Sequence, residues 1–149
     1  HYAKILKSHR VTTVIQLNET KYETGALTSR GIKHFQLDFP CDVAPPAGVL
    51  EEFLELVRCS KGAIGVHCRS GTGWSATIIA LYMMQMHSFT AREAIGWLRI
   101  MRPGSSLAQH QHSLCSVERC RAAPPEILPD HCTHELPDVD GGDWSRARG

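Results

Sequence analysis

The sequence lacks a charge excess of either sign, and it lacks an apolar run long enough to cross a bilayer. Sixteen basic residues stand against fifteen acidic ones, a formal net charge of +1, so nothing indicates a nucleic-acid or membrane-surface partner. A membrane-spanning helix needs roughly 20 consecutive apolar residues, and no stretch approaches that length. These absences favour a soluble protein whose partners act at a local site.

Paired cysteine motifs and internal repeats are missing as well. The six cysteines form no Cys-x-x-Cys pair, and no secretory leader is evident, so we expect reduced thiols and a cytoplasmic or nuclear location. The segment His131-Cys132-Thr133-His134 suggests zinc, but it has no second pair at ligand spacing, so we expect no metal site.

The length and composition are those of a single domain followed by a tail. A chain of 149 residues that is 42% hydrophobic can bury a proper core. Beyond residue 123 the helical periodicity ends, and prolines and acidic residues accumulate. We therefore predict a globular domain over residues 1–123 and a Pro-rich acidic tail over residues 124–149 that is disordered.

Strand-like and helix-like patterns alternate along the domain. Strands are expected at residues 11–17, 35–39 and 63–67, and helices at residues 49–57, 74–87, 91–101 and 107–122. Residues 21–31 are expected to form a short helix or turn. Thr90 and Glu93 form a capping box that begins one helix, and the helix at 74–87 is apolar almost all round, so it should be central. The alternation predicts an α/β three-layer fold with a mostly parallel sheet flanked by helices, and a site at the carboxyl ends of the strands.

One segment carries the chemistry, and it reads His67-Cys68-Arg69-Ser70-Gly71-Thr72-Gly73-Trp74-Ser75. It lies between an expected strand and an expected helix, where backbone N–H groups converge and the helix dipole adds positive potential. Such a place suits a phosphoryl group and lowers the pKa of a cysteine, which favours attack by a thiolate on phosphorus. The simpler alternative is an ordinary buried cysteine, but the flanking histidine and two glycines argue against it.

This segment, with the run from Phe89 to Ser105, resembles the dual-specificity (tyrosine/serine/threonine) protein phosphatases of the cell division cycle fourteen type. These belong to the cysteine-based phosphatase superfamily, whose signature is His-Cys, five residues, Arg, then Ser or Thr. The resemblance covers most of residues 2–120 and only the family's catalytic domain. It implies the dual-specificity phosphatase fold and phosphoprotein or phosphopeptide partners. We expect no cofactor and, from the balanced charge, neither nucleic acid nor membrane as a partner.

The resemblance assigns roles to the residues of the segment. Cys68 matches the nucleophile, Ser75 the hydroxyl that eases departure of the thiolate, and His67 the imidazole that orients the loop. The backbone amides that match the phosphate cradle are those of Arg69, Ser70, Gly71, Thr72, Gly73 and Trp74.

Trp74 departs from the pattern, because the family has an arginine there that clamps the phosphoryl oxygens in the transition state. Indole offers one neutral hydrogen-bond donor, whereas a guanidinium is charged and donates two hydrogen bonds in a bidentate contact. Charged contacts are about twice as strong as neutral ones, and loss of even one donor to a transition-state oxyanion costs roughly 10²- to 10³-fold in rate. Trp74 is equally well explained as a helix-start residue that packs on the domain or as a cap on the pocket.

Two further stations differ from the family. Its general acid lies four residues before a proline, where this chain has Cys41; Asp42 remains a candidate acid, with Asp38 a weaker one, although a solvated carboxylate is the simpler interpretation of Asp42. The loop that positions water for the second step has two glutamines in the family, matched here by His110 and Gln111. Without that resemblance, His110 and its neighbour His112 would be interpreted as exposed helix residues.

Three functions are therefore open. The first is a pseudophosphatase that folds and binds phosphate weakly but hydrolyses nothing useful. The second is a slow but genuine phosphatase in which Arg69 or Arg102 supplies the missing charge. The third is a non-catalytic interaction or phosphopeptide-binding module whose pocket is plugged by the indole of Trp74.

Overall fold

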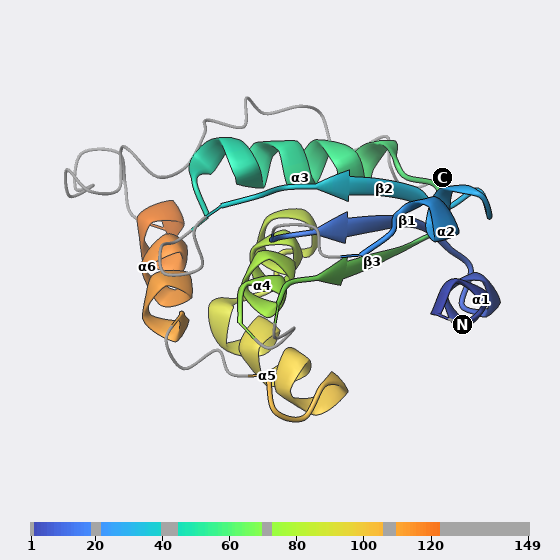
Figure 1. Ribbon diagram of the computed structural model, residues 1–149. Coiled ribbons are helices and arrows are strands. Elements are labelled where there is room, and N and C mark those ends of the chain that lie inside the picture. The colour runs from blue at the N-terminus through green and yellow to red at the C-terminus, as the bar shows by residue number, and fades with distance from the viewer. Residues whose placement is uncertain (1, 19–21, 40–44, 70–72, 106–109, 123–149) are drawn as a thin grey trace.

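The computed structural model describes residues 2–18, 22–39, 45–69, 73–105 and 110–122. Within them, three parallel strands form a sheet in the order β2-β1-β3. The strands are β1 (Val11–Gln16), β2 (Lys33–Gln36) and β3 (Ala63–His67). Their arrowheads point the same way (Figure 1). The predicted three-layer α/β fold with a parallel sheet is confirmed.

The bounds of one strand were predicted wrongly. β2 begins at Lys33 and ends at Gln36, whereas the aromatic and apolar residues up to Phe39 suggested a strand over residues 35–39. Leu37 still donates its backbone N–H to the Gln16 carbonyl at 2.8 Å. Leu37 and Phe39 then turn into the hydrophobic core, so their hydrophobicity reports burial and not strand pairing.

Helices surround the sheet, and their bounds agree closely with the sequence pattern at the positions that matter for the site. The helices are α1 (Tyr2–Ser8), α2 (Gly25–Thr28), α3 (Ala47–Cys59), α4 (Trp74–His87), α5 (Ala91–Met101) and α6 (Gln111–Ala122). The predicted bounds of α4 and α5 are confirmed, and the capping box of Thr90 and Glu93 is present. α1 was not predicted, α2 is much shorter than residues 21–31, and the predicted start of the last helix at residue 107 lies outside the described residues.

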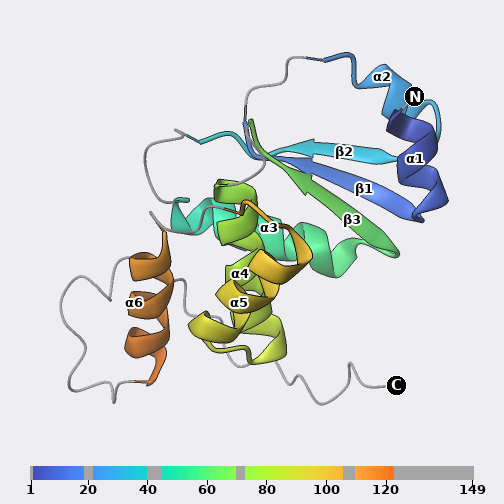
Figure 2. The same ribbon diagram turned by 90° about the horizontal axis from the view of Figure 1, so that it is seen from below.

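The two faces of the sheet pack against different helices. On one face, the side chains of α1 and α2 cover Val11 and Val14 of β1. On the other face, Ile15 joins a larger core built from α3, α4 and α5. In Figure 2, α4 and α5 run close together with α6 beside them, and these three helices contact one another.

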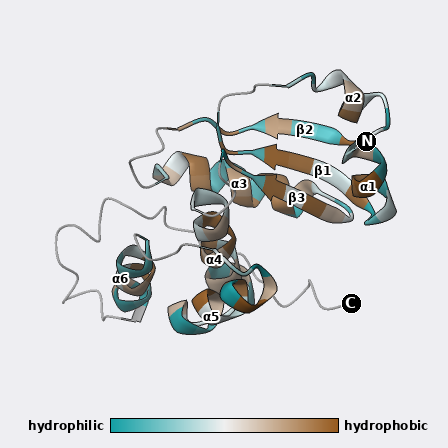
Figure 3. Ribbon diagram, turned by 60° about the horizontal axis from the view of Figure 1, so that its bottom comes forward, coloured by the Kyte–Doolittle hydropathy of each residue, from teal (hydrophilic) through white to brown (hydrophobic). Residues whose placement is uncertain are grey.

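The helix α4 lies at the centre of this larger core, as its composition predicts. Eight of its residues are buried, and Figure 3 shows hydrophobic residues along β1, β3 and much of α4, with hydrophilic positions on α5 and α6. A helix buried on most sides is held firmly, because interiors pack as densely as organic crystals. The packing of α4 therefore holds its first turn, which follows the cysteine loop, in a fixed position.

Three other expectations concern the rest of the chain. The tail predicted over residues 124–149 and the candidate zinc segment within it lie outside the described residues. Of the helices in the part that the structure describes, none is long and apolar enough to cross a membrane. The expectation that all cysteines are reduced is wrong at Cys120, which the structure places in a disulfide bond.

Candidate functional site

The position of Cys68 is fixed by strand pairing. It is the first residue after β3, where His67 pairs with Gln16 of β1 and accepts a hydrogen bond on its carbonyl from the Leu17 N–H at 2.8 Å. β3 begins after Gly62, whose φ of +114° suits glycine. The cysteine therefore lies at the carboxyl end of a parallel strand, where open α/β sheets place their ligands.

The thiol of Cys68 contacts the first turn of α4. Its Sγ lies 3.4 Å from Oγ of Ser75, whose side chain is 1% exposed. A thiol donates a hydrogen bond to the hydroxyl, and after ionisation the hydroxyl can instead donate to the thiolate. Cys68 is half-buried and is not in a disulfide bond. This contact is the arrangement expected for a nucleophile and the hydroxyl that stabilises its anion.

Trp74 is the first residue of α4, and its indole packs between two other rings. The ring of Phe39 meets it edge-on with centroids 5.8 Å apart, at an interplanar angle of 71°. The imidazole of His110 stacks on it with centroids 3.8 Å apart, at an angle of 37°. Trp74 is half-buried and adjoins the larger core. Of the two interpretations of Trp74, packing on the domain is therefore present in the structure.

His110 lies at the same end of α4, immediately before α6. A methyl group on Gly73 would lie 3.9 Å from His110 Nε2, so the imidazole approaches the residue that caps α4. His110 is half-buried, and burial lowers its pKa below the ordinary value. The interpretation of His110 as an exposed helix residue is wrong, whereas His112 on α6 is exposed.

A chain of hydrogen bonds reaches His67 from the middle of the sheet. Gln16, which is 1% exposed, donates from Nε2 to the Asn18 carbonyl at 3.0 Å, and its Oε1 lies 3.0 Å from His34 Nε2. The hydroxyl of Tyr22 lies 3.1 Å from His34 Nε2 and 3.0 Å from His67 Nε2. The residues of this chain, Gln16, His34, Tyr22 and His67, are called the histidine relay below.

The amide of Gln16 fixes the tautomer of His34. Its Nε2 donates to the Asn18 carbonyl, so its Oε1 faces His34 and accepts, which places the His34 proton on Nε2. Because that single proton is directed at Gln16, the direction of the hydrogen bond between Tyr22 and His67 follows the tautomer of His67. In either direction, the hydroxyl links the ring that precedes Cys68 to the sheet.

Burial also changes the acid–base behaviour of the relay. The pKa of His34 is lowered, first by burial and second by the neighbouring charge of His67. The pKa of Tyr22 is raised by burial. Both shifts favour the neutral forms on which the hydrogen-bond pattern depends. Gln16, Tyr22 and His34 were not predicted as site residues; the available signal was a glutamine at the end of a strand otherwise suited to burial.

The remaining candidate residues fall into two groups. Ser70, Gly71, Thr72, Cys41 and Asp42 lie outside the described residues. The side chains of Arg69, Asp38 and Arg102 are exposed, and Arg102 ends α5. Gln111, the first residue of α6, accepts a hydrogen bond from Arg99 at 3.3 Å, so its amide oxygen is turned toward α5 in this structure.

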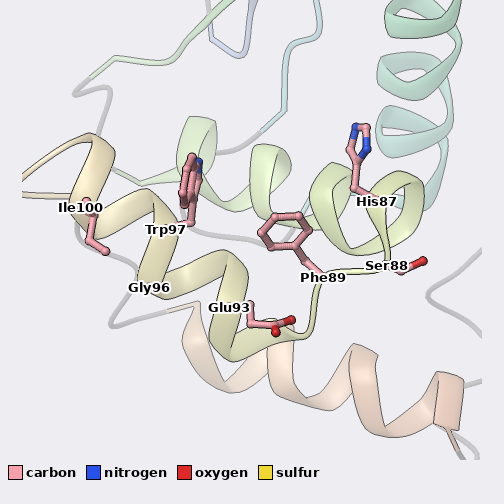
Figure 4. A pocket seen from close by; sticks show the side chains of 7 residues that line it. All are labelled: His87, Ser88, Phe89, Glu93, Gly96, Trp97 and Ile100. Atoms are coloured by element: carbon pink, nitrogen blue, oxygen red, sulfur yellow. The ribbon is translucent and has the colours of Figure 1, made fainter.

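A separate hollow of about 530 Å³ lies at the other end of α4. It is lined by His87, Ser88, Phe89, Glu93, Gly96, Trp97 and Ile100, with Phe89 and Trp97 turned toward it in Figure 4. At a rise of about 1.5 Å per residue, the length of α4 separates it from Trp74 by roughly 20 Å. This hollow is therefore not part of the cysteine site.

Comparisons with known proteins agree with this geometry. The family described as "Dual specificity phosphatase, catalytic domain" matches residues 1–120. The chain is 42% identical over 113 residues to dual specificity protein phosphatase CDC14B of Mus musculus, over 76% of this chain and 23% of that protein. It is 40% identical over 113 residues to CDC14A of Homo sapiens, over 76% of this chain and 19% of that protein.

A solved structure gives the same result at the level of the fold. The putative protein tyrosine phosphatase from Leishmania major superposes with a TM-score of 0.68 at 26% identity, over 76% of this chain and 77% of that chain. The chain therefore belongs to the dual-specificity phosphatase catalytic-domain family. Within that family it is similar to the CDC14 phosphatases, and it spans 23% of the length of CDC14B and 19% of CDC14A.

Proposed function

We propose that this chain is a CDC14-type phosphatase domain that holds the phosphoryl group of a phosphoprotein at Cys68 but turns it over very poorly. Cys68 would be the nucleophile, Ser75 the hydroxyl that stabilises the departing thiolate, and the amides from Arg69 to Trp74 the cradle. The observation that carries the proposal is the packing of Trp74 between Phe39 and His110, at the position where the family has its arginine.

The replacement of arginine by tryptophan at position 74 removes a large part of the transition-state stabilisation. A guanidinium offers charge and a fork of donors aimed at the equatorial oxygens, whereas indole offers one neutral N–H. Loss of one donor to a developing oxyanion costs roughly 10²- to 10³-fold in rate, and loss of a charged pair costs more. The thiol of Cys68 can form the cysteinyl-phosphate at a useful rate only if the negative charge that develops on the phosphoryl oxygens is stabilised. Neither the histidine relay nor the hydroxyl of Ser75 supplies a cation for that purpose.

Neither arginine considered as a substitute favours the slow-phosphatase alternative. The side chain of Arg69 is exposed, so its charge is screened by solvent. Arg102 is exposed at the end of α5. A general acid is also missing from the expected slot, which holds Cys41, and Asp42 would have to act from one residue further on.

The test compares the unmodified domain with Cys68→Ser in the hydrolysis of an aryl phosphate, whose good leaving group needs little help from a general acid. We expect the two rates to coincide within error across pH 5 to 8. A rate for the unmodified domain that exceeds that of Cys68→Ser by 100-fold or more would establish a genuine phosphatase and overturn the proposal. Circular dichroism of both proteins controls for folding.

A further inference from the structure

The first turn of α4 is accompanied by one titratable ring that can become a cation. A methyl group on Gly73 would lie 3.9 Å from His110 Nε2, and the imidazole stacks on the indole of Trp74 with centroids 3.8 Å apart. Gly73 and Trp74 are the last cradle residues before Ser75. The side chain of His110 is thus held against the closing end of the cysteine loop, on the residue that replaces the arginine.

We propose that His110, as an imidazolium, is an anion-binding residue of this loop and supplies the positive charge that Trp74 cannot. The ligand class is a tetrahedral oxyanion such as a phosphoryl group or sulfate. The inference rests on the proposed function, because it requires that the loop between Cys68 and Ser75 accepts such an anion. It adds that anion binding is coupled to the uptake of one proton.

The indole has a definite part in this arrangement. A cation within about 6 Å of the face of a tryptophan is stabilised by the ring quadrupole, and the imidazole lies well inside that distance. Both ring nitrogens of an imidazolium donate hydrogen bonds, whereas the neutral ring has one donor. Trp74 therefore stands where the family has a permanently charged guanidinium, and its indole stabilises the imidazolium form of His110 instead.

The ionisation of His110 is conditional because of its surroundings. Burial lowers its pKa, so the empty site holds a neutral ring near pH 7. Among the described residues, the other titratable groups near this end of the packed elements are the thiol of Cys68, the exposed side chains of Arg69 and Asp38, exposed His112 on α6, and Arg99 of α5 through Gln111. An oxyanion bound beside Gly73 would add negative charge close to the imidazole and so raise the pKa of His110.

The test is calorimetric titration with sulfate, which stays a dianion between pH 5 and 8, so that the ligand itself does not titrate. All proteins carry Cys68→Ser, which removes the thiolate as a second source of pH dependence. Titrations in two buffers of different ionisation enthalpy give the number of protons taken up. The variant is His110→Gln, and the matched control is His112→Gln, an exposed histidine two residues further along the chain.

In the Cys68→Ser protein and with His112→Gln, we expect sulfate to bind about tenfold more tightly at pH 5.5 than at pH 7.5, the change that a one-unit pKa shift produces. That gain and most of the proton uptake should vanish in His110→Gln. NMR gives an independent measurement in the Cys68→Ser protein that retains His110 and His112. There, the imidazole signals of His110 should show that sulfate raises the pKa of His110 by about one unit.

Two results would overturn the inference, and they are distinguishable. If sulfate binds but the pH dependence and the His110 resonance are unaffected by substitution or by ligand, His110 is not an anion-binding residue, and the proposed function still stands. If sulfate produces no heat at pH 5.5, and none after Trp74→Ala either, the loop does not accept oxyanions. Both the inference and the proposed function then fail.

Discussion

The indole of Trp74 and the imidazole of His110 stack with ring centroids 3.8 Å apart, and this contact joins the first residue of α4 to the residue before α6. Phe39 completes the group by meeting the indole edge-on. Segments from three parts of the chain therefore meet at residue 74, the first residue of α4. Residue 74 contributes to the packing of the domain, and under the proposed function it also stands in place of the catalytic arginine.

Trp74→Ala should destabilise the domain. Truncation of a tryptophan removes apolar burial and here also two aromatic contacts, and such losses amount to roughly 3–5 kcal/mol in a full core. Because Trp74 is half-buried, we expect a loss of about 2 kcal/mol in the free energy of unfolding, measured in urea at pH 7. The control is Trp97→Ala on α5, whose side chain is 51% exposed and should cost less than about 1 kcal/mol. Equal losses would mean that the stack contributes nothing.

Gly62→Ala should disturb the strand that carries Cys68. Gly62 has a φ of +114°, and an added Cβ would lie 2.7 Å from Thr12 Cγ2. The side chain of Thr12 is held by its hydrogen bond to the Lys61 carbonyl at 2.9 Å, so it cannot turn away without losing that bond. We expect a loss of about 2 kcal/mol in the free energy of unfolding.

The matched glycine is Gly96 in the interior of α5, where an added Cβ would meet nothing within 4 Å. Gly96→Ala should stabilise the domain by up to about 1 kcal/mol, because alanine loses less backbone entropy in a helix. Thermal and urea unfolding of the two variants measure the difference. A Gly62→Ala protein as stable as Gly96→Ala would contradict the assigned backbone at residue 62.

Acid should weaken the domain through His34. Its pKa in the folded state lies below the unfolded value of about 6.5, because burial and the charge of His67 oppose protonation. The folded state thus binds fewer protons, so this stability is complete above about pH 6.5 and is lost as the pH falls through 6.5 toward the folded pKa. His34→Gln should lose less free energy of unfolding between pH 7.5 and 5.5 than the parent.

The control for this pH dependence is His9→Gln, because the side chain of His9 is exposed in the turn after α1. Its acid sensitivity should match that of the parent. If His34→Gln is as acid-sensitive as His9→Gln, the protonation of His34 does not govern the response.

Much of the fold could be predicted because local signals and burial agree. The apolar run that forms α4 and the capping box of Thr90 and Glu93 are signals of adjacent residues, and both gave correct helix bounds. The end of β2 could not be predicted, since Leu37 and Phe39 are hydrophobic for reasons of core packing. Hydrophobicity alone does not distinguish a paired strand from a buried segment that leaves the sheet.

In the site too, contacts between residues close in the sequence could be predicted, whereas contacts between distant residues could not. Cys68 and Ser75 are seven residues apart, and the strand-to-helix turn brings them into contact, so their pairing could be anticipated from the motif. The stack of Trp74 on His110 and the bond of Tyr22 to His67 join positions 36 and 45 residues apart in the sequence. Such contacts depend on tertiary packing, and no periodicity in the sequence announces them.

The central claim is that Trp74 is the main cause of poor turnover of an aryl phosphate, whose leaving group needs little help from a general acid, and Trp74→Arg tests it most directly. The measurement is kcat/KM for an aryl phosphate at pH 6 to 7, with Trp74→Lys as a charge-only comparison and Cys68→Ser added to each. We predict that Trp74→Arg gains at least about 100-fold over the unmodified domain, that lysine gains less because it lacks the fork, and that Cys68→Ser abolishes both gains. A folded Trp74→Arg protein with no more activity than its Cys68→Ser counterpart would contradict the account.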